Sequence, residues 1–182
     1  MESYRELPPN LPVPEDDGAA AHLRGARLPG IALASTSGEE IDLAIAAEEL
    51  LVLYVYPSTG VPGKPMPDGW DEIPGARGCT PQNCAFRDLD TELRGRGARL
   101  HGCSSQPLSE QREFAERERI PYPLLNDSDL RLADHPGLPT FAVEGRRLYK
   151  RLTMIVRGGE ISDVIYPVFP PGSDAAQALA LL

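Results

Sequence analysis

Residues that commonly hold metal ions are scarce in this sequence, which has three cysteines and three histidines among 182 residues. No cysteine pair shows the Cys-x-x-Cys spacing of zinc sites and dithiol reductases, and no two histidines stand four residues apart. A metal centre and a thioredoxin-type disulfide reductase therefore fit the sequence poorly. We expect a protein that works without a metal ion or another cofactor.

Excess positive charge and long apolar runs are also missing. The formal net charge is −9, which argues against a nucleic-acid-binding surface. The most apolar stretch, residues 50–56, is too short to cross a bilayer, and we find no basic segment followed by an apolar run and a cleavage site. We therefore expect a cytoplasmic protein that binds neither nucleic acid nor membrane. In that reducing compartment, cysteines are more often catalytic or core residues than cross-links.

The chain has one domain's length, and its patterns alternate between strand and helix. Four prolines between positions 7 and 14 predict that residues 1–21 form an extended arm ahead of a domain over residues 22–182. Segments 31–36 and 40–43 flank a glycine-containing turn and predict an N-terminal β-hairpin. Further strands are expected at 50–56, 99–104, 141–145, 152–156 and 161–168, and helices at 80–94, 108–119 and 174–182. This order predicts an α/β fold of three layers, with a mixed central β-sheet flanked by helices.

A long loop rich in proline and glycine, residues 58–78, follows the apolar strand at 50–56. Loops of this length in compact domains are usually functional or disordered. Ligands of α/β sheets bind beyond the carboxyl ends of the strands, which is where this loop starts. Trp70 is the only tryptophan, and it either anchors the loop by packing or roofs a pocket.

Cys79 stands directly before the expected helix, where unpaired backbone N–H groups and the helix dipole favour a thiolate. Cys84 lies five residues further on. In an intact helix its Cα would lie about 7.5 Å further along the axis and roughly 140° around it. A disulfide needs Cα atoms within about 6.8 Å. We therefore expect no resting disulfide between the two, but a transient one that forms when the helix unwinds locally.

At this point the sequence resembles the bacterioferritin-comigratory or Q-type peroxiredoxins, which belong to the alkyl hydroperoxide reductase/thiol-specific antioxidant superfamily. The resemblance covers roughly residues 28–168. The matching residues are Pro57 after the buried strand, Gly78-Cys79-Thr80, Gln82, Cys84, Phe86-Arg87-Asp88 and Arg151-Leu152-Thr153.

The resemblance implies a thioredoxin-like fold and thiol-dependent reduction of hydrogen peroxide or organic hydroperoxides. It implies that Cys79 is the peroxidatic cysteine, that Cys84 resolves its sulfenic acid as an intramolecular disulfide, and that Arg151 lies beside the thiolate. A guanidinium there holds the thiolate ionised and donates to the peroxide oxygens. A dithiol reductant such as thioredoxin or a glutaredoxin-like protein would restore the thiols. Members of this family are often monomers, and the N-terminal arm would also suit a weak homodimer.

One position departs from the family pattern, because the threonine expected three residues before Cys79 is Ala76 here. Thr59 at the end of the strand is the candidate substitute, since its hydroxyl is able to accept from peroxide and donate to the thiolate. Thr59 shaping a turn is the alternative. If the threonine role is lost, the chain would instead be a weakly active or non-catalytic thioredoxin-fold redox-sensing module. Cys103, on an expected strand, is interpreted as a core residue, with a second resolving role as the alternative.

Overall fold

The computed structural model describes residues 4–182 and contains a seven-stranded mixed β-sheet in the order β2-β1-β5-β4-β3-β8-β9. Its strands are β1 (Ala32–Ser35), β2 (Glu40–Asp42), β3 (Leu50–Val55), β4 (Arg99–Ser104), β5 (Leu124–Asn126), β8 (Leu152–Arg157) and β9 (Glu160–Ile165). β6 (Thr140–Val143) and β7 (Arg146–Tyr149) form a separate antiparallel pair. The helices are α1 (Leu43–Ala46), α2 (Cys79–Asp88), α3 (Asp90–Gly95), α4 (Leu108–Glu118), α5 (Arg131–Asp134) and α6 (Ser173–Leu181), with a 3₁₀ turn, η1 (Trp70–Glu72).

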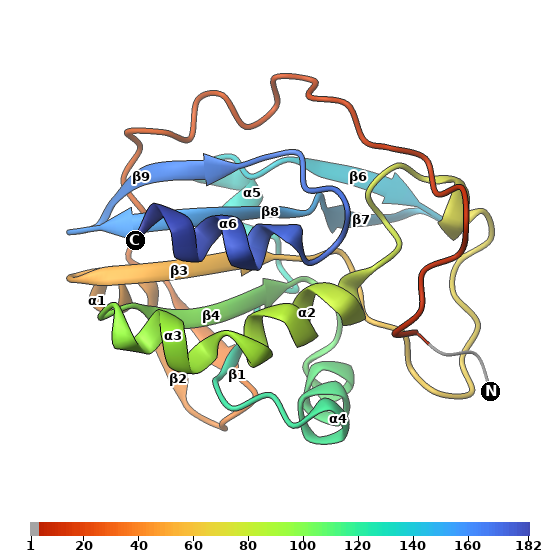
Figure 1. Ribbon diagram of the computed structural model, residues 1–182, viewed down its shortest axis with the longest axis horizontal. Helices are drawn as coiled ribbons and strands as arrows, with labels where there is room; N and C mark the ends of the chain where they lie inside the picture. The colour runs from red at the N-terminus through yellow and green to blue at the C-terminus, as the bar shows by residue number, and fades with distance from the viewer. Residues whose placement is uncertain (1–3) are drawn as a thin grey trace.

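The apolar strand β3 is an interior strand of the sheet, parallel to β4 on one side and antiparallel to β8 on the other. Its side chains are buried on both faces, as a continuous apolar run predicts. Leu51 and Leu53 belong to one core cluster with Leu43 of α1, whereas Val52 and Tyr54 belong to a second cluster. The second cluster also takes residues from α2, α3, α4 and α6, and Figure 1 shows α2, α3 and α6 covering one face of the sheet. The predicted three-layer α/β fold with its N-terminal hairpin is confirmed.

The helix predicted over residues 80–94 is wrong in one respect, because it is two helices, α2 and α3, that meet at Leu89. Leu89 has φ −100° and ψ 4°, outside helical values. Phe86 before the break and Leu93 after it are both fully buried in the same core cluster. Their i, i+7 spacing predicts this shared face, because seven residues are close to two helical turns.

The strand β7 was not expected from the sequence, because Arg146 and Arg147 mask its apolar character. Only Leu148 and Tyr149 are buried in this strand. It pairs with β6 across the Glu144-Gly145 turn. Leu148 joins Trp70, Ala76 and Val143 in a third small apolar cluster, which fastens the loop over residues 58–78 to the domain.

The N-terminal arm runs along one edge of the molecule and ends beside the 58–78 loop (Figure 1). The first three residues of the predicted arm lie outside the described residues. Lys150 and Tyr166 both bond to the Asp17 carboxylate, and Tyr4 Oη donates to the carbonyl of Lys64 at 3.1 Å. The arm is therefore attached to the domain at both of its ends.

Candidate active site

Cys79 is the first residue of α2 and is 3% exposed. Gly78, which precedes the helix, has φ 106°, a left-handed conformation that glycine adopts without strain. A Cβ at this position would also lie 2.3 Å from Pro171. Glycine is thus required on two grounds, and it delivers the cysteine to the amino end of the helix, as the sequence predicts.

Arg151 lies between β7 and β8 and is also 3% exposed. Its Nη2 donates to Cys79 Sγ at 3.4 Å. The loop before the cysteine wraps the guanidinium, with four backbone carbonyl groups as acceptors, those of Gly75, Ala76, Arg77 and Gly78. A buried positive charge surrounded by neutral acceptors stabilises an anion beside it. The structure brings Arg151 and Cys79 together, as expected.

A short chain of hydrogen bonds fixes the guanidinium from the other side. Gln82, one turn along α2, accepts from Arg151 Nη1 at 2.5 Å and donates to Asp174 Oδ2 at 2.6 Å. Thr153 of β8 donates to the same carboxylate oxygen at 2.7 Å. Burial raises the pKa of Asp174, and the hydrogen bonds from Thr153 and Gln82 and the charge of Arg151 oppose that rise. Three elements therefore hold Arg151 in one orientation.

The sequence did not single out Asp174, which lies in the first turn of α6 like many acidic residues at helix starts. The part that Asp174 plays in the site follows only from its contact with Gln82 in the folded protein. Gln82 was expected from the family pattern to hydrogen-bond backbone near the site, whereas its side chain bonds to those of Arg151 and Asp174.

The position that carries threonine in the family offers only a backbone group here. Ala76 is fully buried, and its carbonyl oxygen accepts from Arg151 at 3.2 Å and from Cys79 Sγ at 3.6 Å. Thr59 is 2% exposed, and its Oγ1 and backbone N–H both donate to Gln106 Oε1. The structure thus directs the Thr59 hydroxyl proton to Gln106 and not to Cys79. The role of Thr59 in catalysis stays a prediction.

A small cavity of about 10 Å³ lies beside Cys79. It is lined by Tyr4, Ser58, Gly60, Met66, Trp70, Arg77, Gly78, Cys79 and Thr80. A space of this size holds about one water molecule. Trp70 packs on Phe141 with ring centroids 6.1 Å apart, as the anchoring alternative predicts, and it also lines this cavity. No pattern in the sequence indicated that Tyr4 of the arm would reach the site.

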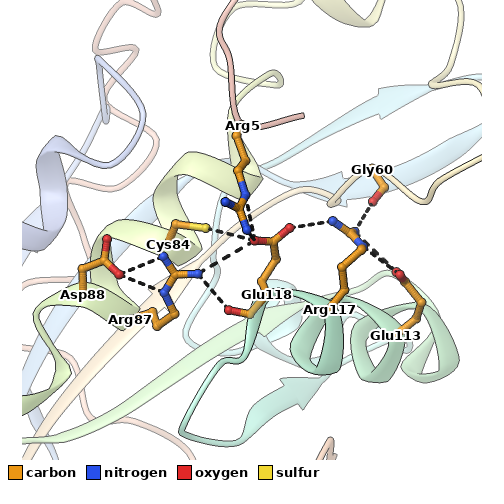
Figure 2. A network of polar contacts seen from close by, with 8 residues as sticks. All are labelled: Arg5, Gly60, Cys84, Arg87, Asp88, Glu113, Arg117 and Glu118. Atoms are coloured by element: carbon orange, nitrogen blue, oxygen red, sulfur yellow. Dashed lines mark hydrogen bonds and ion pairs between the residues drawn. The ribbon is translucent and has the colours of Figure 1, made fainter. Parts of the chain in front are cut away.

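Cys84 is half-buried in the middle of α2, and Cys79, Cys84 and Cys103 are all free thiols. The Sγ atom of Cys84 donates to Glu118 Oε2 of α4 at 3.6 Å (Figure 2). Burial raises the pKa of the Cys84 thiol, Arg87 lowers it, and Glu118 raises it further. Cys103 of β4 is fully buried, and burial raises its pKa well above the ordinary value. Its setting matches the predicted core residue.

Residues 4–182 are the part of the chain that the structure describes. No helix in that range is long and apolar enough to span a bilayer. In the same range, no three His, Cys, Asp or Glu side chains gather in a way that would hold a metal ion.

The family model that matches the chain is Redoxin, over residues 23–182. Among similar curated proteins, the chloroplastic peroxiredoxin Q of Suaeda salsa is 28% identical over 161 residues, which cover 87% of this chain and 66% of that protein. The chloroplastic peroxiredoxin Q of Gentiana triflora is 27% identical over 183 residues, which cover 96% of this chain and 76% of that protein.

Solved structures show the same fold. The peroxidoxin BcpB of Mycobacterium tuberculosis superposes with a TM-score of 0.69 at 28% identity, covering 86% of this chain and 94% of that one. The bacterioferritin comigratory protein of Xanthomonas campestris gives a TM-score of 0.65 at 22% identity, covering 83% of this chain and 88% of that one. The predicted resemblance to Q-type peroxiredoxins is confirmed, and the chain belongs to the Redoxin family.

Proposed function

We propose that this protein is a thiol-dependent peroxidase that reduces hydrogen peroxide or organic hydroperoxides through Cys79. The observation that carries the proposal is the contact of 3.4 Å between Arg151 Nη2 and Cys79 Sγ at the amino end of α2. A guanidinium and a helix amino end both stabilise a thiolate, which is the nucleophilic form of cysteine. The similarity to named peroxiredoxins supports the same assignment.

In the first step, the Cys79 thiolate attacks one oxygen of the peroxide and the O–O bond breaks. The sulfur becomes a sulfenic acid, and the departing oxygen takes up a proton to leave as water or an alcohol. Arg151 donates to the oxygen on which negative charge accumulates, in a site from which bulk water is excluded. Gln82 and Asp174 are positioning residues, because they touch Arg151 or its partner and not the sulfur.

In the second step, Cys84 attacks the sulfenic sulfur, a disulfide forms, and the hydroxyl group leaves as water. The helix must open first, because the two cysteines lie about 7.5 Å apart along the axis of an intact helix. An external dithiol such as thioredoxin or a glutaredoxin-like protein then reduces the disulfide by exchange. We propose that the protein acts as a monomer or a weak homodimer. The cytoplasmic location stays a prediction.

Peroxide consumption driven by a thioredoxin system tests this function. The wild-type protein should consume hydrogen peroxide at a rate that saturates as the dithiol concentration increases. Cys79→Ser should abolish the activity. Cys84→Ser should still react once with peroxide and hold a trappable sulfenic acid at Cys79. Peroxide consumption by Cys79→Ser at the wild-type rate would contradict the proposed function.

One observation favours a second candidate, a weakly active redox-sensing module. Ala76 provides no hydroxyl, and the Thr59 hydroxyl is already bonded to Gln106. A peroxide rate constant close to that of free cysteine would support the sensing module over the peroxidase. Comparing the peroxide rate constants of Thr59→Val and the wild type shows whether Thr59 takes part, and equal constants would remove it from the mechanism.

A further inference from the structure

Glu118, the last residue of α4, is a buried carboxylate that three arginines surround. Its side chain is 3% exposed, whereas those of Arg5, Arg87 and Arg117 are 63%, 24% and 28% exposed. Arg5 Nη2 lies 2.7 Å from Oε2, and Arg117 Nη1 lies 2.7 Å from Oε1. Arg87 donates to the Glu118 backbone carbonyl at 2.8 Å and lies 3.8 Å from Oε2. Figure 2 shows these side chains converging on Glu118 from the arm, α2 and α4.

The oxygen that Arg5 binds also accepts from a cysteine. Cys84 Sγ donates to Glu118 Oε2 at 3.6 Å, so this atom joins the arm, α2 and α4. We use the name clasp for Arg5, Cys84, Arg87 and Glu118. Cys84 has to leave the clasp to reach Cys79, since the intact helix keeps them roughly 140° apart around its axis.

Burial, together with Glu118, disfavours a thiolate at Cys84 while the clasp is closed. Cys84 faces Arg5 from the arm, Arg87 from its own helix, Glu118 from α4 and the Tyr122 phenol before β5. Burial raises the pKa of Cys84, and Glu118 raises it too, against the opposing effects of Arg87 and Arg5. A neutral thiol is a poor nucleophile.

We propose that Glu118 is a positioning residue for disulfide formation, which holds Cys84 on folded α2 as a neutral thiol until the clasp opens. This inference rests on the proposed function, because it assigns Cys84 the resolving role. Arg5 and Arg117 bind the two carboxylate oxygens, and the Oε2 atom that Arg5 binds is also the hydrogen-bond acceptor for the thiol. After opening, the Cys84 proton passes to water, the thiolate attacks the Cys79 sulfenic acid, and the hydroxyl group leaves as water.

The clasp separates the two steps of the reaction in time. Cys79 reacts with peroxide while α2 is folded, because the helix amino end and Arg151 are then in place. Disulfide formation waits for α2 to open, and the strength of the clasp sets how often that happens.

The first test measures the reactivity of Cys84 without any peroxide chemistry. In a Cys79→Ser/Cys103→Ser background, the rate of Cys84 alkylation by iodoacetamide is followed from pH 6 to pH 10. Glu118→Gln should move the midpoint of this profile to lower pH, because it removes the negative charge beside the sulfur. The rate at pH 7.5 should rise by about three- to tenfold, the range expected for loss of one ordinary intramolecular hydrogen bond.

Glu113→Gln is the matched control, since Glu113 lies on the same helix and pairs with Arg117 but does not contact Cys84. It should leave the profile unchanged. Glu118→Gln is expected to fold, because the side chains of Arg5, Arg87 and Arg117 all reach solvent. If it does not fold, Glu118→Asp provides the test. Glu118→Asp keeps the negative charge but places it further from the Cys84 sulfur. It should therefore move the midpoint of the alkylation profile to lower pH by less than Glu118→Gln does.

The second test follows disulfide formation after rapid mixing with peroxide, by acid quench and mass spectrometry. Glu118→Gln should form the disulfide about three- to tenfold faster than the wild type, with the same rate of sulfenic acid formation. An alkylation profile identical to that of the background protein, or slower disulfide formation, would overturn the proposal. Absence of any disulfide in the wild type would overturn the proposed function, while alkylation would still report on the clasp.

Discussion

Arg151 is the residue on which the chemistry of the site depends. It is buried, it donates to Cys79, and it is enclosed by carbonyl oxygens and Gln82. Its planar guanidinium reaches the sulfur with one nitrogen and Gln82 with another. A lysine ammonium would bring the charge but not this two-sided geometry.

Arg151→Lys should therefore slow the reaction of Cys79 with hydrogen peroxide by about 100-fold at pH 7, as loss of an oriented donor does in other active sites. Rapid-mixing measurement of sulfenic acid formation gives the rate constant. Arg147→Lys is the control, because Arg147 is exposed on β7 and bonds to Thr140. A rate constant for Arg151→Lys within twofold of the wild type would contradict the role of Arg151.

Asp174 gives a prediction about pH and stability. Burial raises its pKa in the folded protein, so the folded state holds the proton more tightly than the unfolded state. The stabilisation that this proton provides is complete below the ordinary aspartate pKa and is lost as pH rises through the raised value. Asp174→Asn cannot ionise, so this loss does not affect it. The free energy of unfolding of Asp174→Asn minus that of the wild type should therefore increase from pH 4 to pH 7. Denaturant titrations at both pH values measure this difference, and a constant difference would contradict the raised pKa.

At the level of elements, α2 both places Cys79 and keeps Cys84 away from it. Because α2 must open before the disulfide forms, destabilising this helix should speed disulfide formation between Cys79 and Cys84. Ala85→Gly in the middle of α2 costs the folded helix about 0.5–1 kcal/mol, which corresponds to roughly two- to fivefold more of the open state. Disulfide formation should accelerate by that factor, and sulfenic acid formation should not change.

Ala176→Gly in α6 is the matched control for this variant, because it makes the same replacement at an exposed position of another helix. It should lower stability without speeding the disulfide. Quenched-flow mass spectrometry follows both steps. Equal rates of disulfide formation in Ala85→Gly and wild type would show that opening of α2 does not limit resolution.

The sequence predicted the elements whose signals are local. β3 followed from its apolar run, β4 had the predicted bounds, and Cys79 at the start of α2 followed from glycine and the helix pattern. The break at Leu89 and the strand β7 were missed, since no glycine or proline marks the break and two arginines precede the buried residues of β7. Arg151 was expected from the family resemblance alone, as no local feature ties it to a cysteine 72 positions earlier.

Contacts made by remote segments were beyond the reach of sequence patterns. Glu118 lies in a charged helix where nothing distinguishes it from its neighbours, and Asp174 is an ordinary acidic residue at a helix start. Tyr4 belongs to an arm that the proline content describes only as extended. Each acquires its place in the site because the fold brings distant segments together.

Across the whole molecule, the N-terminal arm reaches the surroundings of both cysteines of α2. Tyr4 lines the cavity beside Cys79, and Arg5 binds Glu118 beside Cys84. The Tyr4 ring lies so close to Gly60 that a Cβ there would come within 2.3 Å of it. Arg77 lies over the same ring, 5.7 Å from its centre. The arm thus closes the small cavity from outside.

Tyr4→Ala should enlarge this cavity and favour larger substrates. The ratio of the rate constants for cumene hydroperoxide and hydrogen peroxide should rise by about threefold or more, since pocket size discriminates by factors of this order. Tyr4→Phe retains the ring, loses only the hydrogen bond to Lys64, and should keep the wild-type ratio. An unchanged ratio in Tyr4→Ala would mean that the arm does not limit access to Cys79.

Disulfide mapping by mass spectrometry, after one equivalent of hydrogen peroxide is added to the fully reduced wild-type protein, tests whether Cys79 and Cys84 are the reacting pair. We expect one disulfide, between Cys79 and Cys84, with Cys103 left as a free thiol because it is fully buried. A disulfide that includes Cys103, or oxidation that leaves Cys79 as a free thiol, would contradict it.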